Sequence, residues 1–349
     1  MTETVYTGDL VTTFSAAAGG VFLLPDRREN MKQTIGFIGA GVTGTALAAK
    51  LWQRGYQVVA VSSRSLDSAR RLASHVRDCT VCEGPQQVAD LASVVFITTP
   101  DDIISDIAAG IRWRPGQVAV HCSGVHSIDI LEAATRSGAH TCCLHPLQTF
   151  AGIEEAINTV SGSTFAIEGD DFGLAMAREM AQALDGNVIL LKAGDKVKYH
   201  IAAVTLSNYL VALMKTSADL WQSFGIPQEE AVKAMLPLLK GTVGNIERVG
   251  IPGCLTGPIA RGDVETVRKH VTALEKEHTN SLDIYRVMGL KTLEIALAKG
   301  RISLETAEEI RNLLNEPGEA PASDYEYVYN EFDLEYAAGY LSASPDKSR

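Results

Sequence analysis

The sequence has no excess of basic residues. Its 349 residues include 31 Lys and Arg against 42 Asp and Glu, which gives a formal net charge of −11. A surface that follows a nucleic-acid backbone needs clustered positive charge, so this balance argues against a nucleic-acid-binding protein. More than half of the imbalance lies in residues 316–349, where eight acidic residues stand against Lys347 and Arg349.

Long uninterrupted hydrophobic runs are also missing. A membrane span needs roughly 18 or more consecutive apolar residues, and no stretch reaches that length, so we expect no membrane insertion. The apolar stretch FSAAAGGVFLLP follows a leading segment, MTETVYTGDL, that is acidic and has no Lys or Arg. A secretory signal carries the opposite charge, and we therefore expect a cytoplasmic protein.

Cysteine is too sparse for a disulfide framework. Six cysteines in a chain of this length fit free thiols in a reducing compartment. Cys79 and Cys82 form one CxxC pair, and Cys142 and Cys143 are adjacent. A structural zinc site usually shows two cleanly spaced pairs, so we expect buried thiols and no metal.

The chain from Met31 alternates short β-rich runs with helical ones. The β-rich runs are TIGFIGAG, YQVVAVSSRS, SVVFITT, QVAVHC, AHTCCLH, GSTFAIEG and NVILLKA. Strands that alternate with helices at this interval predict an α/β Rossmann fold, a doubly wound parallel sheet. We assign residues 31–194 to this domain and treat residues 1–30 as an extension without order.

Strand signals stop after Asp195. The helical patterns that follow cover residues 196–224, 227–239, 264–277, 281–297 and 303–314. They predict an all-helical second domain over residues 195–316, followed by an acidic tail at 317–349 that holds five of the ten tyrosines.

A glycine pattern lies between the first strand and the first helix. Gly39, Gly41 and Gly44 form GxGxxG, in which the glycines allow a tight turn, a close backbone approach to a pyrophosphate and close helix packing. The helix N-terminus then offers free N–H groups to the phosphates. We expect the whole loop to bind a dinucleotide: Gly39, Ala40, Gly41, Val42, Thr43 and Gly44.

The end of the second predicted strand favours NADP. An NAD site usually has an acidic residue about 20 residues after the glycines, but this position holds Ser62, Ser63, Arg64 and Ser65. A guanidinium among hydroxyl groups suits a 2′-phosphate, and no carboxylate is present to repel it. NADPH is therefore the predicted cofactor, with an exposed surface arginine as the alternative interpretation of Arg64.

Later strand ends should line the same crevice, because ligands bind outside the carboxyl ends of parallel strands. We expect Thr98, Thr99 and Pro100 to contact the cofactor. Ser123 and His145 are better placed to meet the nicotinamide or the substrate, although each also fits a turn or cap role.

Several motifs together resemble a known family. HCSG, LHPLQTF, GSTFAIEGD, YHIAAVTLSNYLVAL and LTGPIARGDVETVRKH are similar to predicted NADP oxidoreductases with a C-terminal domain of unknown function. This group lies within the superfamily of 6-phosphogluconate and β-hydroxyacid dehydrogenases, pyrroline-5-carboxylate reductases and deazaflavin-dependent NADP oxidoreductases. The resemblance covers about residues 32–315. It implies a Rossmann domain joined to a helical domain, with hydride transfer at a nicotinamide.

The same resemblance implies a proton donor on the first helix of the second domain. In β-hydroxyacid dehydrogenases the donor is a lysine with an asparagine four residues later. The matching positions here are Lys198 and Ala202, so the asparagine is absent.

Helix geometry separates two faces of this segment. At about 100° per residue, Lys198 and His200 point roughly 160° apart. Lys196, Ala203, Val204 and Ser207 share the face of His200, and Asn208 lies near it. We favour His200 as the acid/base, because histidine donates a proton near neutral pH, with Asn208 or Ser207 holding the substrate. The alternative is a histidine hydrogen-bonded in a domain interface.

A polar loop follows in the helical part. GCLTGPIARGD presents Thr256, Arg261 and Asp263, and Arg261 could hold a substrate carboxylate through paired N–H donors. Alternatively, Arg261 and Asp263 form an internal ion pair, and Asp263 caps the helix that follows. Related helical domains often dimerise, so we also expect a homodimer through this domain.

Together these features predict an NADPH-dependent reductase or dehydrogenase. The expected substrate is a small carbonyl, imine or hydroxy compound that bears a carboxylate. Ser123, Asn208 and Arg261 would orient it beside His200, with Lys198 as the alternative donor. Two other hypotheses stay open: a non-catalytic NADP-binding sensor and a deazaflavin-linked NADP oxidoreductase.

Overall fold

The computed structural model describes residues 2–7, 10–15, 22–23, 33–277 and 281–315. The chain divides into two compact units, between Ala212 and Leu213. The division falls within a helix, whereas the sequence interpretation places the domain boundary at residue 194. Each unit is described by itself below.

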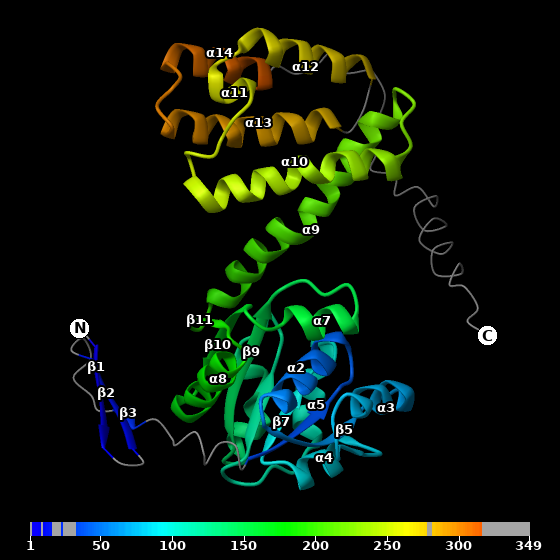
Figure 1. Ribbon diagram of the computed structural model, residues 1–349, viewed down its shortest axis with the longest axis vertical. Helices are drawn as coiled ribbons and strands as arrows, with labels where there is room; N and C mark the ends of the chain where they lie inside the picture. Colours follow the sequence, from blue (N-terminus) through cyan, green and yellow to red (C-terminus); the bar gives the residue numbers. More distant parts are fainter. Residues whose placement is uncertain (1, 8–9, 16–21, 24–32, 278–280, 316–349) are drawn as a thin grey trace. The chain divides into compact units, whose positions relative to one another are not determined.

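An eight-stranded sheet forms the centre of the first unit (Figure 1). Its strand order is β11-β10-β9-β8-β7-β4-β5-β6. The bounds are β4 (Thr34–Ile38), β5 (Gln57–Ser62), β6 (Thr80–Val81), β7 (Val94–Ile97), β8 (Val118–His121), β9 (His140–Leu147), β10 (Thr164–Gly169) and β11 (Asn187–Leu190). The Rossmann-type α/β fold expected from the sequence is confirmed.

One strand pair departs from the predicted parallel sheet. β9 and β10 are antiparallel, with Glu168 opposite Cys143, while all other pairs in this sheet are parallel. The intervening segment contains a helix, α7 (Ile153–Thr159), and this helix made the pattern resemble an ordinary parallel crossover. The sheet is therefore mixed at this end.

Helices cover both faces of the sheet because its strands are apolar on both sides. Phe37 and Phe96 stack in one core, with ring centroids 4.8 Å apart, and their neighbours Ile38 and Ile97 lie in the other. The first core includes residues of α2 (Val42–Gln53), α3 (Leu66–Ser74), α7 and α8 (Asp171–Ala183). The second includes residues of α4 (Pro85–Leu91), α5 (Ile104–Gly110) and α6 (Glu132–Arg136).

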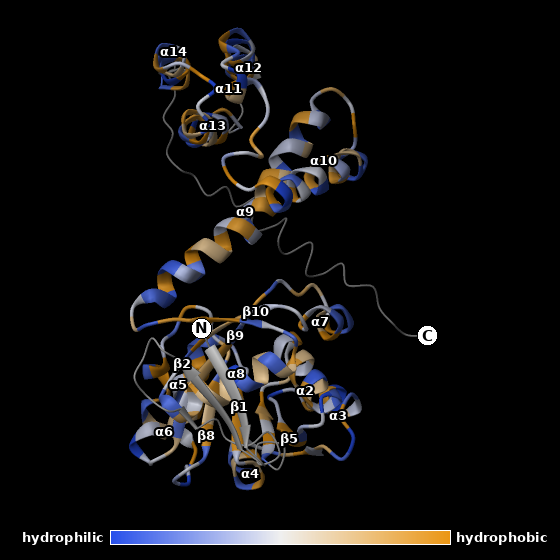
Figure 2. Cartoon of the chain, turned by 60° about the vertical axis from the view of Figure 1, so that its left-hand side comes forward, coloured by the Kyte–Doolittle hydropathy of each residue, from blue (hydrophilic) through white to orange (hydrophobic). Residues whose placement is uncertain are grey.

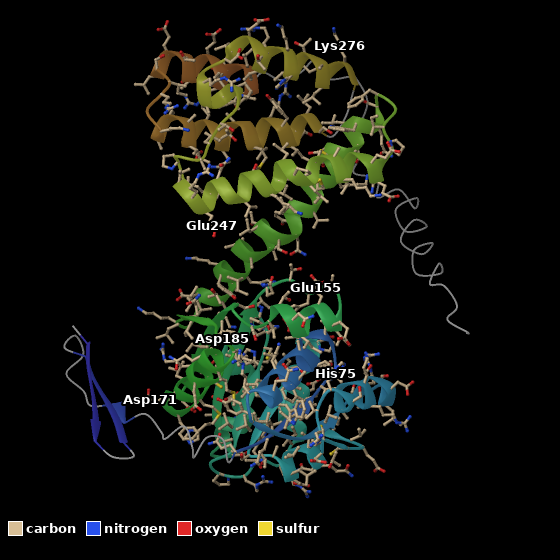
Figure 3. All side chains as sticks on the ribbon, in the orientation of Figure 1. His75, Glu155, Asp171, Asp185, Glu247 and Lys276 are labelled. Carbon is tan, nitrogen blue, oxygen red and sulfur yellow. The ribbon has the colours of Figure 1, made fainter. Side chains whose placement is uncertain are left out.

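Charged side chains occupy the outer surfaces of these helices. Glu155, Asp171 and Asp185 are exposed, and Figure 3 shows them at the periphery of the first unit. Two short 3-10 helices, η1 (Asp101–Ile103) and η2 (Ile128–Leu131), follow β7 and β8.

Residues near the N-terminus form a small separate sheet. β1 (Thr2–Thr7), β2 (Leu10–Ser15) and β3 (Phe22–Leu23) pair in antiparallel order. The segment expected to be an extension without order thus contains regular structure, in keeping with its β-branched runs TVYT and LVTTF.

The second unit is helical, as expected. α9 (Asp195–Gln222) begins in the first unit, and α10 (Gln228–Val249), α11 (Pro258–Arg261), α12 (Val264–Glu277), α13 (Ser281–Ala298) and α14 (Leu304–Asn315) follow. Val267, Leu293 and Ile310 are buried in its core. α10 continues beyond the predicted end at Leu239, through Gly241 and Gly244, two residues that weaken a helix signal. The acidic tail lies outside the described residues.

One helix has the length and apolar composition of a membrane span. Among the described residues only α9 meets this test, and it meets it by length and composition alone. The same helix carries Lys196, Lys198 and His200 in its first turns.

Candidate functional site

The glycine turn after β4 packs directly against the end of β7. Gly39 has a φ of +104°, and a Cβ atom there would lie 2.7 Å from the carbonyl carbon and oxygen of Thr98. A Cβ on Gly44 would lie 2.4 Å from Oγ1 of Thr98, which donates a hydrogen bond of 2.9 Å to the carbonyl oxygen of Gly39. Two of the three glycines are therefore required by packing within the chain.

Gly41 differs from its two neighbours. A Cβ on this residue would have no protein atom within 4 Å, and its backbone φ of −74° suits any amino acid. It is the N-cap of α2, which has no side-chain cap and no acidic residue in its first turn. The N–H groups of Val42 and Thr43 therefore belong to a positive helix end beside open space, which fits a pyrophosphate.

A pocket of about 530 Å³ opens beside this helix end. It lies where the strand order reverses between β4 and β7, the usual ligand position in doubly wound sheets. Of the residues predicted to bind cofactor, it is lined by Gly39, Ala40, Gly41, Val42, Ser62, Ser63, Arg64, Ser65, Thr98, Thr99 and Pro100. Thr43 and Gly44 do not line it.

Two arginines reach the part of the pocket after β5. Arg64 is exposed and precedes α3 in the chain. Arg71, which the sequence interpretation missed, lies on α3 and lines the same pocket. Arg71 Nη2 donates to Oγ of Ser68 at 3.1 Å, and Ser65 Oγ caps α3 by accepting from the N–H of Ser68. Glu83 is the acidic residue in the lining. The arrangement of guanidinium and hydroxyl groups suits a phosphate on the ribose.

The hydroxyl of Ser123, after β8, is held within the protein. It donates to Oδ2 of Asp101 at 2.7 Å and accepts from the N–H groups of Val125 and His126 at 3.3 and 3.1 Å. Ser123 is also buried. This geometry fixes the loop after β8 and leaves the hydroxyl few bonds to offer a substrate.

A buried lysine joins α9 to the same loop. Lys196 is 2% exposed, and its Nζ donates to the carbonyl oxygen of Ser123 at 2.7 Å and to Sγ of Cys143 at 2.9 Å. No carboxylate of the described residues lies within 4 Å of its ammonium group. The positive charge therefore lies at the carboxyl ends of β8 and β9 without an ion-pair partner there.

Two histidines meet above Gly124. A Cβ on Gly124 would lie 2.8 Å from Nε2 of His145 and 2.8 Å from Nδ1 of His200. His145 Nδ1 is hydrogen-bonded to the Tyr199 hydroxyl at 2.7 Å. Nδ1 of His200 is buried and has no hydrogen-bond partner among the described residues. The two predicted residues His145 and His200 are thus brought together, with Tyr199 behind the first.

Burial determines the protonation of this cluster. It lowers the pKa of His145 to about 4 and that of His121 to about 3, and the charge of Lys196 contributes in the same direction. It raises the pKa of the Tyr199 hydroxyl and of the Cys143 thiol, the latter to about 11. Near neutral pH both of these histidines are neutral, and the tyrosine and the thiol keep their protons.

The remaining residues predicted on α9 differ in their exposure. Lys198 and Asn208 are exposed, and Ser207 is half-buried. Lys198 thus lies on the solvent side of the helix, whereas Lys196 and Tyr199 lie on the side that contacts the strand ends.

Thr256, Arg261 and Asp263 lie in the second unit. Thr256 and Arg261 are exposed. Asp263 caps α12, accepting from the N–H of Thr266 at 3.1 Å and from its hydroxyl at 2.7 Å, and these bonds lower the pKa of Asp263. No ion pair within 4 Å joins Arg261 to Asp263.

The cysteines and the acidic residues form no metal centre in the described part of the chain. All six cysteines are free, and no group of three His, Cys, Asp or Glu residues there is arranged to hold an ion.

Comparison with protein families finds two matches along the chain. Residues 23–146 match a Rossmann-like domain, and residues 163–292 match a domain of unknown function, DUF2520. Among curated proteins no match was found.

Solved structures of similar fold cover most of the chain. Protein TM1727 from Thermotoga maritima is 28% identical, with a TM-score of 0.62, covering 76% of this chain and 100% of that chain. BF3122 from Bacteroides fragilis, named as a candidate NADP oxidoreductase, is 24% identical, with a TM-score of 0.61, covering 76% and 99%. A reductive aminase from Aspergillus terreus in complex with NADPH and ethyl levulinate is 16% identical, with a TM-score of 0.56, covering 80% and 98%.

Proposed function

We propose that this chain, in which a Rossmann-like domain is joined to a DUF2520 domain, is an NADPH-dependent oxidoreductase. It transfers hydride between the nicotinamide and a small carbonyl, imine or hydroxy substrate. The observation that carries this proposal is the pocket after β4 and β5, where Gly41 leaves space beside a positive helix end and Arg64 and Arg71 reach the rim. The names of the similar structures, which include NADP oxidoreductase and NADPH complexes, support the same cofactor.

Each part of the pocket has a role toward this cofactor. The N–H groups at the start of α2 bind the pyrophosphate, and Arg64 and Arg71 bind the 2′-phosphate with the serine hydroxyls around them. Thr98 and Thr99 extend the wall toward the ends of β7 and β8. When bound, NADPH supplies the hydride.

The substrate would meet the residues at the ends of β8 and β9. His145 and His200 present ring nitrogens above Gly124, and the loop of Ser123 supports them. Asn208 and Ser207 stay candidates for holding the far part of a substrate.

The cofactor assignment is tested by paired affinities. Arg64→Ala and Arg71→Ala should each weaken binding of NADPH by at least tenfold while changing NADH binding little, because NADH lacks the 2′-phosphate. Arg70→Ala is the matched control: this exposed arginine lies between the two on the chain and does not line the pocket. Equal weakening of NADPH and NADH in both variants would contradict the assignment.

Turnover measurements distinguish the proposed enzyme from the two alternative functions. A non-catalytic NADP-binding sensor would show the same dependence on Arg64 but no steady oxidation of NADPH with any carbonyl or imine. A deazaflavin-linked oxidoreductase would instead reduce NADP with the reduced deazaflavin. Steady NADPH oxidation that depends on an organic carbonyl or imine is the result expected here.

We further propose that a second copy of the chain covers the apolar surfaces of the helical part. Leu206 of α9 is 77% exposed and Leu238 of α10 is 73% exposed, and Val243 and Val249 of α10 are exposed as well. Figure 2 shows hydrophobic residues along both helices. Large apolar patches on a protein mark interaction sites, and a helix of this type buries its apolar face on association.

Sedimentation measures this association. Leu238→Glu should shift the protein toward the monomer at micromolar concentration, whereas Lys240→Glu, an exposed position two residues further on, should leave the dimer unchanged. A wild-type protein that sediments as a monomer would overturn the proposal.

A further inference from the structure

We propose that His145 is the proton donor of the reaction, that Tyr199 relays a proton to it, and that the group reduced is a neutral carbonyl. This inference rests on the proposed function for its source of hydride. It assigns a role to Tyr199 and chooses among the substrate classes that the proposed function leaves open.

The proposal assigns one tautomer to His145, in which the Tyr199 hydroxyl is the hydrogen-bond donor. The phenol of Tyr199 keeps its proton near neutral pH because burial raises its pKa. The two atoms lie 2.7 Å apart, and we assign the Tyr199 O–H as the donor and Nδ1 of His145 as the unprotonated acceptor. A neutral imidazole carries one proton, so the proton of His145 is on Nε2.

Nε2 of His145 faces the surface above Gly124. It lies 2.8 Å from the position that a Cβ on Gly124 would occupy, as does Nδ1 of His200. Because Gly124 has no side chain, both nitrogens can pack closely over its Cα. Nδ1 of His200 is buried and has no partner among the described residues, so the hydrogen-bonding capacity of this ring is not used there. In the proposed reaction the carbonyl oxygen of the substrate accepts from the N–H group of Nε2 of His145.

The charges around His145 disfavour a cationic substrate. Lys196 carries a buried positive charge without an ion pair among the described residues, and this charge acts on His145. His200 and His121 add no negative charge. Asp101 and Glu168 act on the neighbouring Cys143, but neither is among the charges that shift the pKa of His145. An iminium ion would be repelled here, whereas a neutral C=O group gains hydrogen bonds.

The proton then follows the bonds already present. As the carbonyl carbon accepts a hydride, the π electron pair of C=O moves to oxygen, which takes the proton from Nε2 of His145 and becomes a hydroxyl. Nδ1 of His145 takes the proton of Tyr199, and the resulting tyrosinate regains a proton from solvent, which the half-buried Tyr199 contacts. The transfer is downhill, because an alkoxide is a much stronger base than a tyrosinate.

The tautomer is measured without any substrate. In protein labelled with ¹⁵N-histidine, long-range ¹H–¹⁵N spectra at pH 7 should show His145 as a neutral ring protonated at Nε2. Tyr199→Phe should release it into a mixture of tautomers, and Tyr209→Phe, which changes an exposed tyrosine on the same helix, should not. A wild-type His145 that is protonated at Nδ1 would overturn the relay.

Kinetics test the role in catalysis and the substrate class. With NADPH and a panel of 2-oxo acids, simple ketones and cyclic imines, turnover should occur with carbonyl members. Tyr199→Phe should lower kcat by about a hundredfold, as expected for loss of acid catalysis, with NADPH affinity and thermal midpoint unchanged. Turnover confined to cyclic imines, or an unchanged kcat in Tyr199→Phe, would contradict the inference.

The two proposals fail in different ways. Loss of NADPH binding or of its dependence on Arg64 would overturn the proposed function and leave the tautomer of His145 as measured. Intact NADPH binding and turnover, with His145 protonated at Nδ1, would overturn only the relay.

Discussion

The ammonium of Lys196 donates a hydrogen bond of 2.7 Å to the carbonyl oxygen of Ser123, and this bond ties the first turn of α9 to the loop after β8. The same ammonium contacts the thiol of Cys143 on β9. One buried side chain thus links the end of two strands to the helix that carries Tyr199 and His200. The relative positions of His145 and its partners depend on this link.

Two substitutions of Lys196 should distinguish the contribution of its packing to stability from the contribution of its charge. Lys196→Ala removes a long side chain from a site that is only 2% exposed, so it should lower the free energy of unfolding by about 2–4 kcal/mol. Lys196→Met keeps most of the volume and removes a charge without an ion pair, so its loss should stay below about 2 kcal/mol. Urea unfolding at pH 7.5 measures both. A methionine variant as unstable as the alanine variant would show that the hydrogen bonds dominate.

Two substitutions in the glycine loop should affect different properties, one the stability of the fold and the other the binding of NADPH. Gly39→Ala should destabilise the protein by roughly 2–4 kcal/mol, because φ is +104° and the new Cβ would lie 2.7 Å from the backbone of Thr98. Gly41→Ala should leave the fold unchanged, since its Cβ meets no protein atom within 4 Å, yet weaken NADPH binding by filling the space for the pyrophosphate. Thermal unfolding with and without NADPH distinguishes them. A Gly41→Ala variant with full NADPH affinity would place the pyrophosphate elsewhere.

Much of the first unit could be predicted from the sequence because its strands are short apolar runs between helices. The run TIGFIGAG, for example, carries both the buried strand β4 and the glycine turn. β6 was missed, since the two residues Thr80 and Val81 form too short a pattern. The antiparallel pairing of β9 with β10 was missed as well, because hydrophobic periodicity does not carry strand direction.

The candidate site was predicted in part. Ser123 and His145 follow from the rule that ligands bind at strand ends, and His200 from its place on the helix. Lys196 was placed on the face of His200 but given no role, because lysine is almost never fully buried. Tyr199 was missed because its partner, His145, lies 54 positions away along the chain. Arg71 was missed because only the fold of α3 brings it beside Arg64 at one pocket.

Acid should destabilise the folded chain in a defined pH window. Burial lowers the pKa of His121 to about 3 and of His145 to about 4, from 6.5. Between pH 6.5 and pH 4 the unfolded chain binds more protons than the folded one, so this stability is complete above pH 6.5 and is lost as the pH falls. Each of the two histidines should contribute a slope of at most about 1.4 kcal/mol per pH unit, and the contribution of His145 ends at a higher pH because its pKa is lowered less.

Urea unfolding at several pH values between 7.5 and 5 measures this slope. His145→Gln should flatten it, because the glutamine side chain does not titrate. His75→Gln, a substitution of a partly exposed histidine at the end of α3, provides the control. A slope that is equal in wild type and His145→Gln would show that His145 is protonated in the folded chain at these pH values.

Gly124 should be intolerant of any side chain although its backbone accepts one. The Cβ of Gly124→Ala would lie 2.8 Å from Nε2 of His145 and from Nδ1 of His200, so both rings must move from the place where they meet. Turnover should fall by at least tenfold, because a displacement of about 1 Å is enough for a larger loss, while NADPH affinity stays unchanged since Gly124 does not line the cofactor pocket. Gly152→Ala is the control, because its Cβ would meet no atom within 4 Å. The ring signals of His145 and His200 in ¹⁵N spectra should shift in the first variant and not in the second, and unshifted signals with full turnover in Gly124→Ala would remove the histidine pair from the site.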